Sequence, residues 1–155
     1  MKKLLILIVI FCATGLVKAQ DYNAAIGLRG GFSNGVTFRK MLSSGEAFEG
    51  ILTTRYGGFN VTGLYEIQNN FPSAQRLHWY FGFGAHLGMY QTNRFDKNVS
   101  SNGTEVIIGA DGILGMEYNF DFPLNLSLDW KPAFNLLGYG NFIGDGFALS
   151  ARYYF

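Results

Sequence analysis

Residues 124–136 read LNLSLDWKPAFNL, and apolar and polar side chains alternate along this stretch from one residue to the next. The even-numbered positions are apolar throughout, whereas the odd-numbered positions hold Asn125, Ser127, Asp129, Lys131, Ala133 and Asn135. A period of two is that of a β-strand, because successive side chains point to opposite faces of a sheet. The stretch therefore predicts a strand with one apolar face and one polar face.

The same pattern recurs along the chain, most clearly in residues 77–89 (LHWYFGFGAHLGM). Both stretches are longer than the usual ~5 to 6 residues of a soluble strand and long enough to cross a bilayer at a tilt. The predicted strands are residues 22–32, 36–41, 47–56, 59–67, 77–89, 106–118, 124–136 and 147–155. We therefore predict an all-β fold, an eight-stranded antiparallel up-and-down transmembrane β-barrel.

Three short connections suit hairpin turns between these strands. The expected cross-strand pairs are Phe32 with Val36 around Ser33-Asn34-Gly35, Tyr56 with Phe59 around Gly57-Gly58, and Tyr118 with Leu124 around residues 119–123. In each pair both residues belong to apolar faces, as residues directly opposite one another must. Turn chemistry and alternation therefore agree on an antiparallel meander.

Composition narrows the class of protein. The chain has 155 residues, a length that suits one domain, and only 15% of them are charged. With 48% hydrophobic residues it is too apolar to be disordered, and its formal charge of +1 is too balanced for a nucleic-acid binder. We therefore expect a folded barrel without a nucleic-acid partner.

Residues 1–19 have the three parts of a secretory signal peptide. Lys2 and Lys3 are basic, residues 4–13 are an unbroken apolar run, and Ala19 is a small residue suited to cleavage. Cleavage there leaves residues 20–155 as the barrel domain and removes Cys12, the single cysteine. The mature protein is then expected to lack disulfides and cysteine-ligated metals.

The two faces of the strands allow two environments. In a soluble lipocalin-like barrel the apolar face lines a ligand cavity, whereas in an outer-membrane barrel it faces lipid and the polar face fills the lumen. Long strands, nearly uninterrupted apolar faces and aromatic residues near the strand ends favour lipid. The lipocalin-like barrel stays the alternative.

The chain ends FALSARYYF, with Tyr153 and Phe155 on the apolar face. This ending resembles the C-terminal strand signal that the barrel-assembly machinery recognises in outer-membrane barrels. Together with the signal peptide and eight strands, it makes the mature chain similar to the small Gram-negative barrels of the OmpX and OmpA-transmembrane type, a kind common in Bacteroidota. The resemblance implies a monomer in outer-membrane lipid with both termini in the periplasm. It implies no particular activity, since such barrels differ in function.

The predicted lumen face carries charges of both signs. The inward residues are Arg29, Arg39, Arg55, Lys131 and Arg152 against Glu49, Glu66, Asp111, Glu117 and Asp129. An ion-selective pore would carry an excess of one sign, whereas balanced charges in a narrow interior are expected to pair. A packed polar plug is the favoured interpretation, and a narrow porin-like channel is the alternative.

Catalytic and metal-binding patterns are weak in this sequence. His78 and His86 share the lumen face of one strand, but eight residues separate them by roughly 26 Å, too far to ligate one metal. We expect no enzyme activity, no cofactor and no catalytic residue. Recognition of an envelope or surface protein would fall to two longer external loops, through Arg94, Phe95, Asp96, Tyr139, Phe142 and Ile143.

Overall fold

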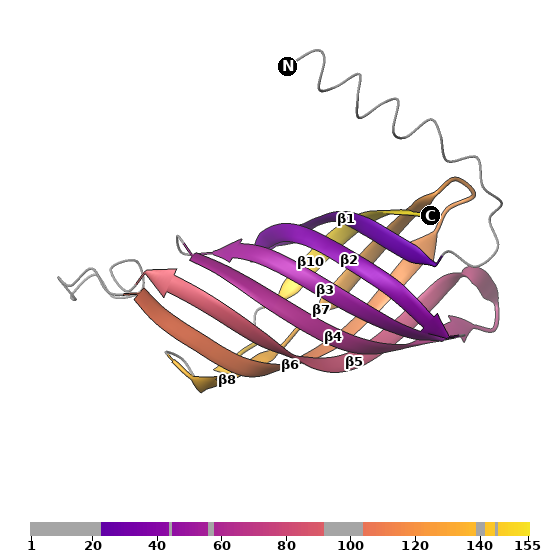
Figure 1. Ribbon diagram of the computed structural model, residues 1–155. Helices are drawn as coiled ribbons and strands as arrows, with labels where there is room; N and C mark the ends of the chain where they lie inside the picture. The colour runs from indigo at the N-terminus through magenta and orange to yellow at the C-terminus, as the bar shows by residue number, and fades with distance from the viewer. Residues whose placement is uncertain (1–22, 44, 56–57, 92–103, 139–141, 145) are drawn as a thin grey trace, which may run out of the picture.

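The structure is a computed structural model of the chain, and it consists of strands and turns (Figure 1). It describes residues 23–43, 45–55, 58–91, 104–138, 142–144 and 146–155. Within these ranges no helix is long and apolar enough to span a membrane. The predicted signal peptide, residues 1–19, lies outside the described residues.

Ten strand segments follow one another along the chain. They are β1 (Ala24–Gly31), β2 (Asn34–Ser43), β3 (Glu46–Arg55), β4 (Gly58–Phe71), β5 (Ala74–Gln91), β6 (Thr104–Asn119), β7 (Leu124–Trp130), β8 (Ala133–Leu137), β9 (Phe142–Ile143) and β10 (Phe147–Tyr154). Every pairing is antiparallel, and pairing of β5 with β6 closes the sheet on itself.

The ten segments make eight strands. β7 and β8 both pair with β6, one after the other, while β10 pairs with β7 and β9 with β8. β7 and β8 therefore form one strand of the barrel, and β9 and β10 form the next one. The predicted eight-stranded antiparallel barrel is confirmed.

One predicted strand is interrupted. Residues 124–136 were expected to run unbroken, but β7 ends at Trp130 and β8 begins at Ala133. The break falls at Lys131 and Pro132, because proline has no N–H for the ladder. Backbone hydrogen bonds to the chain on both sides continue across the break. Gly112 N–H donates to the carbonyl of Pro132 at 2.9 Å, and Lys131 N–H donates to the carbonyl of Gly146 at 3.0 Å.

The hairpin registers differ from the predicted ones. The structure pairs Leu28 with Val36, Thr54 with Phe59, and Tyr118 with Leu126. The predicted pairs Phe32–Val36, Tyr56–Phe59 and Tyr118–Leu124 are therefore wrong, by an even number of residues in each case. An even slip leaves each side chain on its own face, so the predicted faces hold although the partners change.

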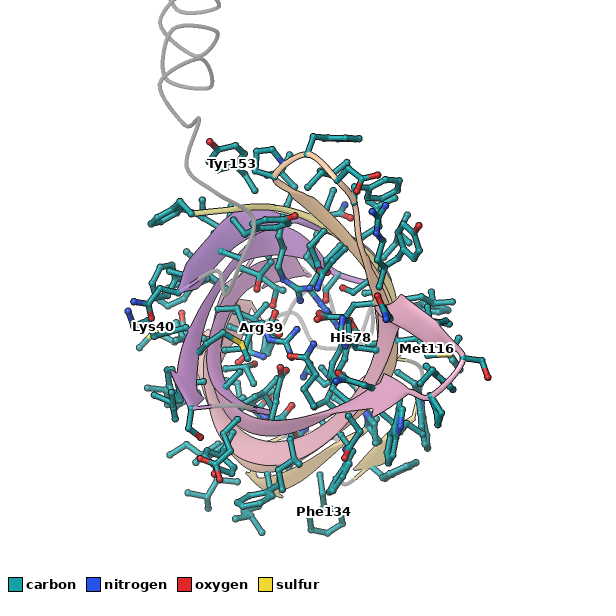
Figure 2. The ribbon with its side chains drawn as sticks, turned by 90° about the vertical axis from the view of Figure 1, so that its right-hand side faces the viewer. Arg39, Lys40, His78, Met116, Phe134 and Tyr153 are labelled. Atoms are coloured by element: carbon teal, nitrogen blue, oxygen red, sulfur yellow. The ribbon has the colours of Figure 1, made fainter. Side chains whose placement is uncertain are left out.

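The barrel is polar inside and apolar outside. Looking into the mouth beside the termini, Arg39 and His78 point into the lumen, whereas Met116, Phe134 and Tyr153 point outward (Figure 2). Leu28 is 70% exposed and Phe83 is 65% exposed, while the side chain of Arg152 is completely buried. The core of this protein is therefore its charged lumen.

Candidate functional site

The lumen contains the predicted charged residues, held there by strand alternation. Arg29, Arg39, Glu49, Glu66, Asp111, Glu117, Asp129 and Arg152 are buried, and Lys131 is half-buried. Arg55 belongs to β3, but its side chain lies outside the described residues. Among the charged lumen residues whose side chains are described, five are acidic and four are basic.

The largest group, here called the termini-side cluster, consists of Arg39, Glu49, Glu66, Glu117 and Arg152. Arg39 Nη2 lies 2.8 Å from Glu66 Oε2, and Nη1 of the same guanidinium donates to Glu117 Oε2. Arg152 Nη2 donates to Glu49 Oε1 at 2.7 Å. The pairs join strands that are not neighbours in the barrel, so the cluster ties opposite walls together.

Neutral side chains complete the coordination of this cluster. Arg152 Nη1 donates to Ser127 Oγ at 2.7 Å and to Asn125 Oδ1 at 3.2 Å. Gln68 Nε2 donates to Glu117 Oε1 at 2.7 Å, and Thr37 Oγ1 donates to Glu49 Oε1. Buried charges need such additional hydrogen bonds, because pairing alone rarely offsets the loss of water.

The second group is the ion pair between Arg29 of β1 and Asp129 of β7. Arg29 Nη1 donates to Asp129 Oδ2 at 2.7 Å, and Arg29 Nη2 ion-pairs with Asp129 Oδ1, so the contact is bidentate. Tyr80 connects this pair to the termini-side cluster. Its hydroxyl donates to Asp129 Oδ2 at 3.2 Å, and Arg39 Cζ lies over its ring, 4.7 Å from the ring centroid.

Apolar side chains surround the ring of Tyr80 inside the barrel. Ile51, Leu64, Tyr80 and Ile113 form one buried cluster, each of them at most 4% exposed. The ring is accommodated because Gly115 has no side chain: a Cβ there would lie 2.6 Å from Tyr80 Cζ. A buried apolar cluster therefore lies on one side of the lumen, and Tyr80 connects it to the Arg29–Asp129 pair.

The third group, the loop-side cluster, consists of His86, Asp111, Lys131 and Asn135. His86 Nδ1 lies 2.6 Å from Asp111 Oδ2 and its Nε2 lies 3.0 Å from Asn135 Oδ1, while Lys131 Nζ ion-pairs with Asp111 Oδ1. Gly109 leaves the space that the imidazole fills, since a Cβ there would meet His86 Cε1 at 2.5 Å.

The two histidines do not converge. His78 lies in the termini-side mouth, where its Nδ1 is 2.7 Å from Asn70 Oδ1, whereas His86 belongs to the loop-side cluster. Nor do the described residues contain a group of three or more His, Cys, Asp or Glu that could hold a metal ion.

Cavities lie toward both ends of the lumen. One of about 60 Å³ borders the loop-side cluster and is lined by Arg29, His86, Tyr90, Lys131 and Asn135, among others. The other, about 810 Å³, is the open mouth beside the termini, lined by amide side chains such as Gln68 and Asn119 together with His78. Tyr80, Leu64 and Glu66, which are completely buried, lie between the two.

Sequence reasoning predicted pairing among the charges and did not predict their neutral partners, although it placed Asn125, Ser127 and Asn135 on the polar face. Thr37, Gln68, Asn125, Ser127 and Asn135 all act as hydrogen-bond partners in the lumen. Each has the parity of the charged residues on its strand, so the alternation could have identified them.

The remaining predicted residues that the structure describes lie at the two ends of the barrel. The rings of Tyr153 and Phe155 are stacked, with their centroids 6.4 Å apart. Phe155 N–H donates to the carbonyl of Ala24 at 2.9 Å, so the C-terminus pairs with β1. Phe142 and Ile143 do not belong to an external loop as predicted: they form β9 at the opposite end, where they pair with Phe134 and Ala133 of β8. The predicted loop residues Arg94, Phe95, Asp96 and Tyr139 lie outside the described residues.

The fold and the lumen together define a class of protein: a small, closed, eight-stranded antiparallel β-barrel with an ion-paired interior and an apolar exterior. No family model matches the chain, and a search of curated proteins found no match.

Proposed function

We propose that the mature chain is an integral outer-membrane β-barrel with a plugged lumen. Both termini lie in the periplasm, and the role is structural or one of surface interaction rather than enzymatic. The observation that supports this proposal is the distribution of polarity, with ion pairs in the interior and large apolar side chains around the exterior.

The exterior would be costly in water. Leu28, Phe83 and Leu149 are each more than half exposed, and they belong to strands around the barrel. Soluble monomers rarely expose contiguous apolar patches above a few hundred Å². Lipid is the solvent that makes such a surface favourable, and closure of the barrel satisfies the backbone hydrogen bonds that lipid cannot.

A lipocalin-like barrel would require the opposite arrangement. Its ligand cavity is lined by apolar side chains and its outer surface is hydrated. Here the inward residues include Arg39, Glu66 and Arg152, which are paired with other side chains rather than arranged around an apolar ligand. Polarity therefore favours the membrane barrel over this alternative.

The plug follows from the packing of the lumen. Tyr80 and the termini-side cluster fill the interior of an eight-stranded barrel, which is just wide enough for side chains. A channel would require Tyr80 and the termini-side cluster to move apart. The porin-like alternative predicts large, stable, ion-selective conductance. We expect planar bilayers to record little or no conductance from the wild type.

Outer-membrane lipid is the proposed environment, and the barrel-assembly machinery is the proposed partner during biogenesis, through Tyr153 and Phe155. Any further partner would be an envelope or surface protein, met by the longer connections between β5 and β6 and between β8 and β10. A monomer needs no partner to cover its apolar exterior, because lipid covers it.

The decisive experiment places a charge on the exterior. Phe83 lies in the middle of β5 and is 65% exposed, so in a water-soluble barrel Phe83→Arg would change stability little. In a bilayer the same arginine near the midplane costs about 2–4 kcal/mol. We expect F83R to reduce the amount of protein in outer-membrane fractions and to lower the folded fraction in lipid vesicles.

The matched control is Phe142→Arg. Phe142 is 66% exposed but lies in β9 next to the loops, where the cost in a membrane falls to about 0–1 kcal/mol. Unboiled and boiled samples are compared on gels, because closed barrels resist dodecyl sulphate until heated. Equal behaviour of F83R and F142R, with wild-type protein soluble after carbonate extraction, would contradict membrane integration.

A further inference from the structure

Two buried carboxyl groups in the termini-side cluster each have an oxygen atom that accepts no hydrogen bond from a described residue. Glu49 and Glu66 are completely buried on the lumen faces of the neighbouring strands β3 and β4, where they are diagonal neighbours: Glu66 lies opposite Ala47, and Glu49 lies opposite Leu64. Glu49 Oε2 and Glu66 Oε1 receive no hydrogen bond from any described residue. Buried polar atoms are nearly always partnered, so these two acceptors on neighbouring strands call for a donor.

The charges of the cluster indicate what that is. Three carboxylates, Glu49, Glu66 and Glu117, face two guanidinium groups, Arg39 and Arg152. Two side chains of β5 face the cluster: Tyr80, which is neutral, and His78, which lies opposite Glu117 and has its Nδ1 2.7 Å from Asn70 Oδ1. The neighbouring Arg29–Asp129 pair is balanced. The five side chains of the cluster therefore carry one negative charge in excess at buried positions, and one positive charge would neutralise it.

The donors are shared unequally among the three acids. Glu49 Oε1 accepts from Arg152 and Thr37, and Glu117 accepts from Arg39 and Gln68. Among the described residues, Glu66 has one ion pair, between its Oε2 and Arg39 Nη2, and the same guanidinium also pairs with Glu117. Glu66 is therefore the acid whose negative charge is least supported.

We propose that the lumen holds one proton between Glu66 and Glu49. Glu66 is the neutral acid, and its hydroxyl donates to the Glu49 carboxylate. A metal ion in the same place would need several oxygen ligands, whereas a proton needs only these two. The proposal concerns the packed barrel itself and holds whether or not the barrel lies in a membrane.

Replacing an acid by its amide distinguishes a neutral Glu66 from the charged acids of the ion pairs, because the amide is neutral too. Glu66→Gln keeps the shape and an N–H donor toward Glu49, so we expect the melting temperature in detergent to stay within a few degrees of the wild type. Asp129→Asn is the matched control, because it also turns a buried acid into its amide but removes the charge that Arg29 requires. We expect D129N to melt well below both.

Infrared spectroscopy of the folded protein in detergent detects the proton directly. At neutral pH the wild type should show the carbonyl stretching band of a protonated carboxylic acid, shifted in D₂O. The band should disappear in E66Q and persist in D129N.

Three results would overturn the proposal. They are a wild type without the band, a band that survives in E66Q, and an E66Q protein that is as destabilised as D129N or fails to fold. A wild type whose stability requires sodium rather than choline at equal ionic strength, without the band, would assign the site to a metal cation instead. None of these outcomes depends on membrane fractionation, so they separate this proposal from that of membrane integration.

Discussion

Replacing Asp129 by alanine removes the partner of a buried cation. Asp129 accepts the bidentate contact from Arg29 and the hydroxyl of Tyr80, and the two charged residues are 2% and 3% exposed. In Asp129→Ala the Arg29 guanidinium stays in the lumen, and among the described side chains it keeps one hydrogen bond, from Nη1 to Ser150 Oγ at 3.4 Å. The variant thus leaves a buried positive charge without its counter-ion.

The size of the effect follows from the cost of such a charge. Breaking a buried ion pair by removing one partner destabilises a protein by about 3–5 kcal/mol. For a chain of this size each kcal/mol lowers the melting temperature by about 2–4 °C, so D129A should melt about 6–20 °C below the wild type. Circular dichroism during heating in detergent, and the folded band on unboiled gels after the same heating, give two independent readings.

Two further variants make the interpretation specific. Asp121→Ala breaks an ion pair with Arg76 whose side chains are 73% and 50% exposed, and we expect little change because water solvates both groups. The double variant Arg29→Met with Asp129→Leu removes both charges, and we expect it to melt above D129A. If D129A melts like the wild type and like D121A, water reaches Arg29 and the plug is refuted.

The remaining predictions concern packing, assembly and conductance. Gly115→Val should destabilise the barrel by about 1–3 kcal/mol, because its side chain would overlap Tyr80, whereas Gly112→Val on the outer face should be tolerated; thermal melts of both test this. Deleting Phe155 should lower the amount of protein in outer-membrane fractions more than deleting Gln20 does, as read by immunoblot, and equal amounts would contradict the assembly role. Wild-type protein in planar bilayers should show little or no conductance, and large ion-selective currents would favour the porin-like alternative.

The faces of the strands could be predicted from the sequence because buried and exposed side chains alternate with a period of two residues in every strand. Asp129 and Arg152 were placed in the lumen by parity alone, and both are completely or almost completely buried there. Alternation identifies a face but says nothing of height along the barrel axis. The partner of each charge therefore could not be read from the sequence: Arg39 pairs with both Glu66 and Glu117, from two different strands.

The unbroken strand over residues 124–136 was wrong for a local reason. Pro132 fits the alternation as an apolar residue, but its missing N–H interrupts the ladder, which the side-chain pattern does not register. The short β9 compensates by pairing with β8 beyond the break. A rule that weighs backbone donors as well as side chains would have placed this boundary.

The hairpin registers raise the question of what fixes them, since alternation permits every even slip. A slip of two residues moves a side chain by roughly 7 Å along its strand and leaves the apolar exterior intact. In the lumen the same slip would carry Arg29 away from Asp129, leaving two buried charges unpaired at a cost of several kcal/mol. Because Arg29–Asp129 and Arg152–Glu49 join strands that are not neighbours, each pair restricts several registers at once. We infer that the buried ion pairs select the register that the apolar face and the turns leave open.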